Sequence, residues 1–87
     1  MKRLLKTLVF ASLLLFISCG NNPEKSRLYY DKGIDYLYHS QFEEAIEYFD
    51  KAIKFNDKNH EAYFYRGCAK YNIYQKDEAL EDYNKTL

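Results

Sequence analysis

The 87-residue chain is poor in the residues that interrupt regular structure, with three glycines, one proline and no tryptophan. This scarcity excludes collagen-like sequences and Gly/Pro-rich disordered chains. The two cysteines are too few for a disulfide framework. Thirteen basic side chains are balanced by thirteen acidic ones, so the excess of positive charge that marks nucleic-acid-binding proteins is missing. We therefore expect no nucleic-acid partner.

Residue types that carry catalysis or bind metals occur in the chain, but not in productive arrangements. His39 and His60 have no zinc-like spacing to each other or to Cys68. Adjacent acids such as Glu43 and Glu44 fall on expected helix exteriors, where no pocket could raise the pKa of a general acid. A Gly-rich phosphate-binding loop is missing as well. The sequence therefore predicts neither an enzyme nor a metal site.

Charge and hydropathy set residues 1–18 apart from the rest of the chain. Lys2, Arg3 and Lys6 carry the only charges of this segment, and an apolar run covers residues 8–17. A membrane-spanning helix needs about 20 apolar residues, whereas a positive start and a short apolar run are typical of a signal peptide. We therefore expect this segment to be a signal peptide.

The residues at its end resemble a bacterial lipobox, in which a small residue stands immediately before a cysteine. Residues 16–19 read Phe-Ile-Ser-Cys. The resemblance implies attachment of diacylglycerol and acyl chains to Cys19, with no other cofactor, and residues 19–25 would then be a lipidated tether. It also implies a bacterial envelope location on the membrane, and Gly20 in place of an aspartate favours the outer membrane. The alternative is an uncleaved N-terminal anchor with an incidental cysteine.

From residue 23 onward the sequence pattern is helical. Asn22 followed by Pro23 is typical of a helix start, and later breaks fall near Ser40, at Asn56–Asn59 and at Tyr74–Gln75. Because stretches of similar length lie between the breaks, we expect four helices of about 14 residues each.

This helical part contains an internal sequence repeat. Residues 26–53 align with residues 60–87 at a displacement of 60 − 26 = 34 positions. A 34-residue helix–turn–helix period is typical of the tetratricopeptide repeat, and the sequence resembles that family. The resemblance implies an all-α fold of antiparallel helix–turn–helix repeats, with a first repeat at 26–59 and an incomplete second repeat at 60–87. The identical pairs are Tyr29/Tyr63, Gly33/Gly67, Gln41/Gln75, Glu44/Glu78, Ala45/Ala79, Glu47/Glu81 and Lys51/Lys85.

Apolar residues at helical spacing form a stripe on the segment that follows Ser40. Gly33 and Gly67 are small where two antiparallel helices must approach closely, so we expect a close helix contact at each. The spacing of Ser40 and Glu43 predicts a capping box at the start of the second helix. The stripe consists of Phe42, Ala45, Ile46, Phe49, Ala52 and Ile53.

Oppositely charged residues stand four positions apart on the expected second and fourth helices. Glu47 with Lys51, and Glu81 with Lys85, have the spacing and order that favour ion pairs along a helix. We interpret these charges as a solvated outer face of the molecule.

In tetratricopeptide repeats, the first helix of each pair lines a concave groove. Aromatic side chains dominate the corresponding positions here, and they are favoured binding anchors because they bury a large area at low entropic cost. The resemblance therefore implies a protein or peptide partner, although some of these aromatics could instead pack between the repeats. By position, the groove residues are Arg27, Tyr30, Asp31, Ile34, Leu37, Tyr38, Glu61, Phe64, Tyr65, Cys68, Tyr71 and Asn72.

Three interpretations of function remain open. The first is a membrane-anchored adaptor or scaffold for proteins of the bacterial envelope. The second is a fragment of a longer lipoprotein with such repeats, because the second repeat is about six residues short and solenoid repeats bury their faces on neighbours. An uncovered face would also favour self-association. The third is a glycan-binding component of an outer-membrane uptake system, in which tyrosines would stack on sugars.

Overall fold

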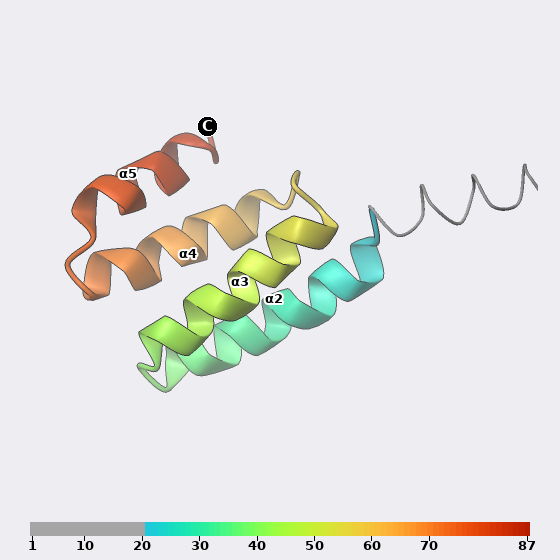
Figure 1. The fold of residues 1–87 in the computed structure, drawn as a ribbon, viewed down its shortest axis with the longest axis horizontal. Coiled ribbons are helices and arrows are strands. Elements are labelled where there is room, and N and C mark those ends of the chain that lie inside the picture. Colours follow the sequence, from blue (N-terminus) through green and yellow to red (C-terminus); the bar gives the residue numbers. More distant parts are fainter. Residues whose placement is uncertain (1–20) are drawn as a thin grey trace, which may run out of the picture.

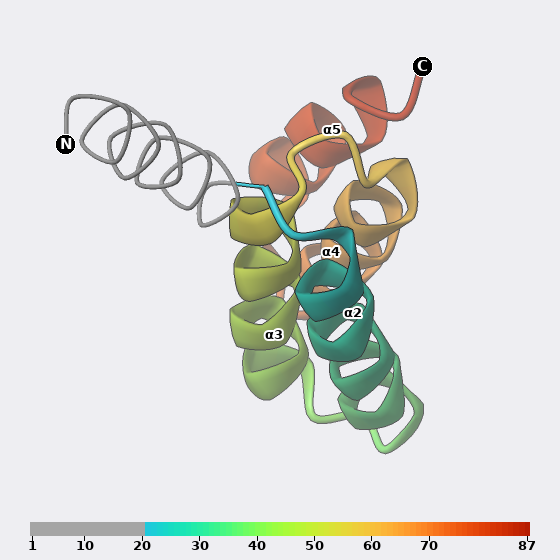
Figure 2. The same ribbon diagram turned by 90° about the vertical axis from the view of Figure 1, so that its right-hand side faces the viewer.

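The computed structural model of the chain describes residues 21–87, which form four helices and no strand. Labelled from α2, they are α2 (Pro23–Tyr38), α3 (Phe42–Phe55), α4 (His60–Asn72) and α5 (Lys76–Asn84). Each helix packs antiparallel on the next in the chain, and α2 also touches α4 (Figures 1 and 2). The predicted all-α fold of helix–turn–helix repeats is confirmed. The expected signal peptide and Cys19 lie outside the described residues.

The first helix begins where the sequence predicts. The side chain of Asn22 accepts a hydrogen bond of 3.1 Å from the amide of Lys25, and Pro23 occupies the first helical turn. The backbone amide of Asn22 also donates to the carbonyl of Phe55 over 2.8 Å. This bond fastens the start of α2 to the end of α3. Within residues 21–87, no helix combines the length and apolarity needed to cross a bilayer.

The turns inside the two hairpins are alike and correct one local prediction. Ser40 and Tyr74, which are equivalent residues of the two repeats, have positive φ values of 59° and 67°. Because the chain reverses through this left-handed residue, Ser40 cannot adopt the extended conformation of an N-cap. The N-cap is Gln41, without a side-chain hydrogen bond. The predicted capping box between Ser40 and Glu43 is therefore wrong.

The turn between the repeats is held by asparagines. The side chain of Asn56 accepts from the amide of Lys58 over 3.1 Å, and that of Asn59 accepts from the amide of Ala62 over 3.1 Å at the start of α4. Short side chains with a carbonyl oxygen can satisfy backbone amides that a turn leaves free. The break predicted at this point is confirmed.

The core lies where α3 is covered on both sides by α2 and α4. The stripe residues Ala45, Phe49 and Ala52 are fully buried, together with Ala62 and Ala69 of α4. Small alanines let the helix backbones approach, while one phenylalanine fills the remaining volume. The predicted stripe therefore faces the core at these positions.

Both expected glycine contacts are present. A Cβ atom added at Gly33 would lie 2.6 Å from Cε1 of Phe49, and one added at Gly67 would lie 2.8 Å from Cε1 of Tyr83. These distances are shorter than real Cβ contacts allow. Gly33 and Gly67 thus set the close approach of the two helices in each hairpin.

Candidate functional site

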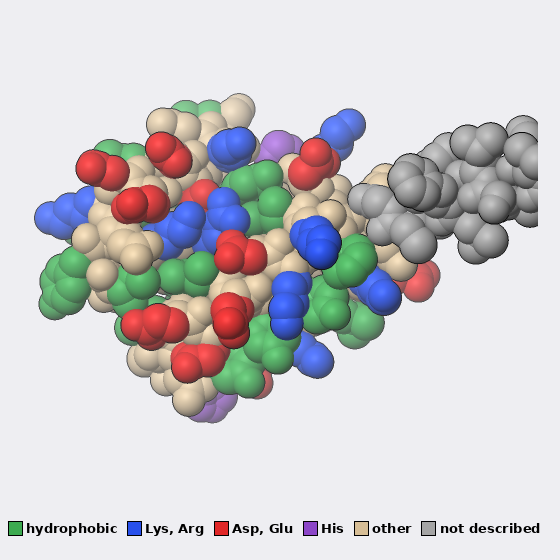
Figure 3. All heavy atoms as spheres, viewed as in Figure 1, with side chains coloured by type: hydrophobic (Ala, Val, Ile, Leu, Met, Phe, Trp, Pro, Cys, Tyr) green, Lys and Arg blue, Asp and Glu red, His purple; other side chains and the backbone are tan. Residues whose placement is uncertain are grey.

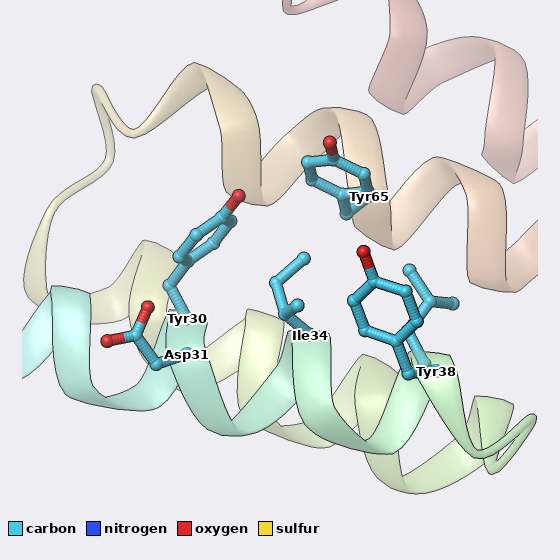
Figure 4. A pocket seen from close by; sticks show the side chains of 6 residues that line it. Tyr30, Asp31, Ile34, Tyr38 and Tyr65 are labelled. Atoms are coloured by element: carbon cyan, nitrogen blue, oxygen red, sulfur yellow. The ribbon is translucent and has the colours of Figure 1, made fainter.

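A groove opens between the first helices of the two repeats. It contains a cavity of about 350 Å³. Figure 4 shows its aromatic side chains approaching from both sides, Tyr30 and Tyr38 from α2 and Tyr65 from α4. The structure thus brings side chains of both repeats to one surface. The residues that line the cavity are Tyr30, Asp31, Ile34, Leu37, Tyr38 and Tyr65.

The aromatic rings of this groove differ in their role. The ring of Tyr30 lies 6.0 Å from that of Phe49 and 6.1 Å from that of Tyr65, so it also packs against the core. Burial and the negative charge of Glu61 raise the pKa of Tyr30 to about 12, and its phenol therefore stays neutral at ordinary pH. Tyr38, by contrast, is 84% exposed and makes no contribution to the core. Tyr38 is free to contact a partner.

A second, more polar cavity of about 350 Å³ adjoins the first and includes Arg27 and Glu61. Its floor is Ser26, which is buried although it is polar. The hydroxyl of Ser26 donates to the carbonyl of Ala52 over 2.7 Å and accepts from the side-chain amide of Asn59 over 3.3 Å. We call this arrangement the Ser26 bridge. It connects α2, α3 and the turn that begins the second repeat.

The other four predicted groove residues lie farther along α4. Phe64 packs on Tyr83 of α5, with ring centroids 5.6 Å apart. Burial and the neighbouring thiol of Cys68 raise the pKa of Tyr83 to about 12. Tyr71 is 55% exposed, and Asn72 turns back to donate to the carbonyl of Cys68 over 2.7 Å. These residues extend the aromatic surface towards α5 without lining the first cavity.

Sequence reasoning missed a charged cluster that joins three helices. Arg66 of α4 donates twice to the carboxylate of Asp82 on α5, over 2.8 and 2.7 Å, and once to that of Asp50 on α3, over 2.7 Å. Lys70 adds an ion pair of 3.1 Å to Asp82. The sequence signal for this cluster is a pair of cations four positions apart on one helix, Arg66 and Lys70.

The equivalent positions of the first repeat hold a different interaction. Lys32, which aligns with Arg66, lies over the ring of Tyr48 with 5.7 Å from its Nζ to the ring centroid. Tyr48 in turn aligns with Asp82. The same pair of positions thus holds a cation–π contact in one repeat and an ion pair in the other. The Lys51–Tyr29 contact at 5.6 Å, in contrast, recurs as Lys85–Tyr63 at 5.6 Å.

Both histidines direct their Nδ1 atoms at backbone carbonyls. The Nδ1 atom of His39 donates to the carbonyl of Asp35 over 2.8 Å, and that of His60 donates to the carbonyl of Lys85 over 3.2 Å. In the part of the chain that the structure describes, no three His, Cys, Asp or Glu side chains form a group suited to a metal ion. The free thiol of Cys68 is half-buried.

Comparison with known proteins also indicates a helical repeat. The family model of the tetratricopeptide repeat matches residues 26–59. The chain is 45% identical over 38 residues to tetratricopeptide repeat protein 6 of Homo sapiens, an alignment that covers 44% of this chain and 7% of that protein. It is 33% identical over 66 residues to an uncharacterized protein of Methanocaldococcus jannaschii, which covers 76% of this chain and 77% of that protein.

No solved structure matches the chain significantly. The fold and the repeat match nevertheless agree with each other and with the 34-residue period of the sequence. Residues 26–59 therefore carry a tetratricopeptide repeat, within an all-α fold of tetratricopeptide-like helical hairpins.

Proposed function

We propose that the protein is a membrane-anchored tetratricopeptide lipoprotein of the bacterial envelope that holds a peptide segment of a partner protein in its groove. Tetratricopeptide repeats generally mediate protein–protein interaction. The observation that carries the proposal is the cavity of about 350 Å³, which takes its lining from both repeats and is mostly apolar and aromatic. Apolar pockets with a few polar groups are the usual form of a binding site.

The charges around the groove indicate the kind of peptide. Asp31 borders the first cavity and Glu61 borders the second, while Arg27 is the one basic side chain among the residues that line the two. Complementary charge favours encounter with a partner and suppresses wrong partners. The groove therefore suits a segment with an apolar or aromatic residue next to a lysine or arginine.

Selection from a displayed peptide library tests this function. We expect enriched peptides to carry an apolar or aromatic residue beside a basic one. Their affinity should fall about tenfold with Tyr38→Ala, the loss typical of one exposed aromatic anchor, and also with Asp31→Lys. Tyr74→Ala is the matched control, because Tyr74 is 89% exposed but lies outside both cavities.

Four outcomes would contradict the groove as a peptide-binding site. Enriched peptides could bind Tyr38→Ala as well as the native protein, or lose affinity equally with Tyr74→Ala. Glycans bound in place of peptides on a parallel array would favour the uptake-system interpretation. Concentration-dependent sedimentation without peptide binding would favour self-association through exposed side chains such as Leu80, which is 59% exposed.

The anchor is a separate part of the proposal and rests on the lipobox-like residues 16–19. Two or three acyl chains give stable membrane binding, whereas a single chain gives only marginal binding. We expect palmitate labelling and outer-membrane fractionation of the native protein, and loss of both in Cys19→Ala. Equal labelling of the two proteins would exclude Cys19 as the lipidated residue.

The proposal also covers the case in which the groove is part of a longer repeat array. The chain matches only 7% of the human relative, so the activity of any larger protein would include more than the surface described here. The peptide preference of this groove does not depend on that length.

A further inference from the structure

A row of aromatic rings closes the outer seam between α2 and α3. The row runs Tyr36, Tyr48, Tyr29, Phe55, so that its rings come alternately from the two helices. Successive ring centroids are 5.2, 6.2 and 5.7 Å apart, with interplanar angles of 10°, 29° and 12°. The rings thus lie nearly parallel along the seam.

Three lysines cover this row. The Nζ atom of Lys25 lies 5.2 Å from the ring centroid of Phe55, that of Lys32 lies 5.7 Å from Tyr48, and that of Lys51 lies 4.9 Å from Tyr48. All three lysines are exposed. None of them forms an ion pair with another residue of the range 21–87. Their stems lie on apolar rings while their ammonium groups stay available to a partner.

An exposed leucine stands among these lysines. Leu28 is 61% exposed and, together with Lys25, Tyr29 and Lys32, it borders a mostly apolar cavity of about 220 Å³. Lys25 and Lys32 are three and four residues away along α2, so they flank Leu28 on the same helix face. We call the surface formed by Lys25, Leu28, Lys32, Lys51 and the aromatic row the lysine–aromatic face.

Positive charge is concentrated at one end of the hairpin. Helix α3 has Glu43 and Glu44 in its first turn and Lys54 in its last turn. At the end where α3 stops, the first turn of α2 adds Lys25 but also the acidic Glu24. In Figure 3, basic and apolar side chains alternate at the lower right, while most acidic side chains, apart from one at the right edge of the coloured surface, lie farther to the left. The bond from the amide of Asn22 to the carbonyl of Phe55 fixes the start of the described chain at this same end.

We propose that the lysine–aromatic face docks onto an anionic phospholipid surface. Lysines would meet the headgroup phosphates, and Leu28 would enter the boundary of the acyl chains, as in other interfacial segments that combine basic and apolar residues. This proposal extends the anchored-lipoprotein function but does not depend on peptide binding by the groove.

The position of the face favours a membrane over an acidic protein. Cys19 and Asn22 are three positions apart in the chain, and three residue steps span at most about 10 Å. A lipid on Cys19 would therefore hold the end of the hairpin that carries Lys25 and Phe55 close to the bilayer. Where these lysines come within about 8 Å of anionic headgroups, the Debye length at physiological salt, their attraction is only partly screened.

Vesicle binding by the full, unlipidated chain tests the proposal. Vesicles of phosphatidylcholine alone are compared with vesicles that also contain phosphatidylglycerol. The triple variant Lys25→Gln, Lys32→Gln, Lys51→Gln is compared with a control that changes Lys58, Lys76 and Lys85 to glutamine. Both variants lose the same charge, and both keep residues 1–20, so any binding by that segment is common to all the proteins.

We expect the triple variant to lose about a hundredfold in affinity for the anionic vesicles, since each lysine near such a surface contributes about a factor of five. The control should lose much less. Leu28→Ser should weaken binding about tenfold without a change in melting temperature, because this side chain is not part of the core.

Equal losses in the triple variant and the control would overturn the proposal, because net charge alone would then explain binding. So would native affinity in the triple variant. Binding to an acidic peptide such as polyglutamate, without binding to anionic vesicles, would assign the face to a protein partner instead. Circular dichroism melting of each variant shows whether a lost interaction reflects lost folding.

Discussion

Asp82 is a carboxylate that the fold buries almost completely, with 3% of its side chain exposed. Burial alone would raise the pKa of Asp82, but hydrogen bonds from Arg66 and Lys70 and their positive charges outweigh it and lower the pKa below its ordinary value. In return, the hydrogen bonds to Asp82 raise the pKa of Arg66. Two cations therefore hold one buried anion in its charged form.

This arrangement predicts a loss of stability in acid. Because the pKa of Asp82 is lowered in the folded state, the unfolded chain takes up the proton first as the pH falls below about 4. The contribution of Asp82 is therefore complete at neutral pH and disappears as the pH falls through its folded pKa. We expect Asp82→Asn to lower the stability at neutral pH by about 3 kcal/mol. The stability of this variant should also decrease less as the pH falls than that of the native protein. Urea denaturation across a pH series measures both.

The control for this prediction is Asp50→Asn. Asp50 also pairs with Arg66, but 55% of its side chain is exposed, so its removal should cost less than about 1 kcal/mol. Equal costs for the two variants would show that burial of Asp82 does not matter. If the free energy of unfolding of Asp82→Asn fell with pH as it does in the native protein, the pH dependence would belong to other carboxylates.

At the scale of helices, the two hairpins use the same glycine contact with unequal freedom to adapt. Gly33 faces Phe49, which is fully buried in the core. Gly67 faces the ring of Tyr83, which is only partly buried. A ring with solvent on one side can move to admit a methyl group, whereas a ring that is closely packed on all sides cannot.

Alanine substitutions should therefore separate the two hairpins. Alanine in place of glycine favours a helix by about 1 kcal/mol, but forced overpacking costs about 1–3 kcal/mol. We expect Gly33→Ala to destabilise the protein. Gly67→Ala should destabilise it less, although the backbone oxygen of Ala79, 3.2 Å from the added Cβ, cannot move aside as the ring can. Thermal melting of the two variants measures the difference. A larger cost at Gly67 than at Gly33 would mean that the second hairpin is the more closely packed one.

The helices and their contacts could be predicted because their causes are local or periodic. The capping of α2 by Asn22 needs only neighbouring residues, and the roles of Gly33 and Phe49 follow from spacing within the repeat. The conformation of Ser40 could not be predicted in the same way. The spacing of Ser40 and Glu43 also suits a capping box, so the local sequence allows two conformations. The packing of α3 against α2 selects the left-handed turn.

Side-chain partners across the molecule were harder to predict still. The sequence pattern favours ion pairs of Lys51 with Glu47 and of Lys85 with Glu81, yet the described residues contain neither pair. Both lysines lie over tyrosine rings from the neighbouring helix. A contact between helices can compete with an exposed pair along one helix because the latter is worth only about 0.3–0.5 kcal/mol.

For the whole molecule, the groove was predicted from the family resemblance and not from residue chemistry. The structure brings Tyr30 and Tyr65 together from different repeats, which no local pattern could indicate. The division of the twelve positions between two cavities and the flank of α5 also depends on the angle between the hairpins. That peptides bind there stays a prediction.

The Ser26 bridge has a consequence for how the molecule opens. In a stacked array each hairpin could unfold locally while its neighbour persists. Here, Asn59 both caps α4 and donates to the buried hydroxyl of Ser26, so fraying of the second hairpin disturbs the polar interior of the first. A buried polar group that loses a partner is costly. We therefore expect the bridge to couple unfolding of the second repeat to that of the first.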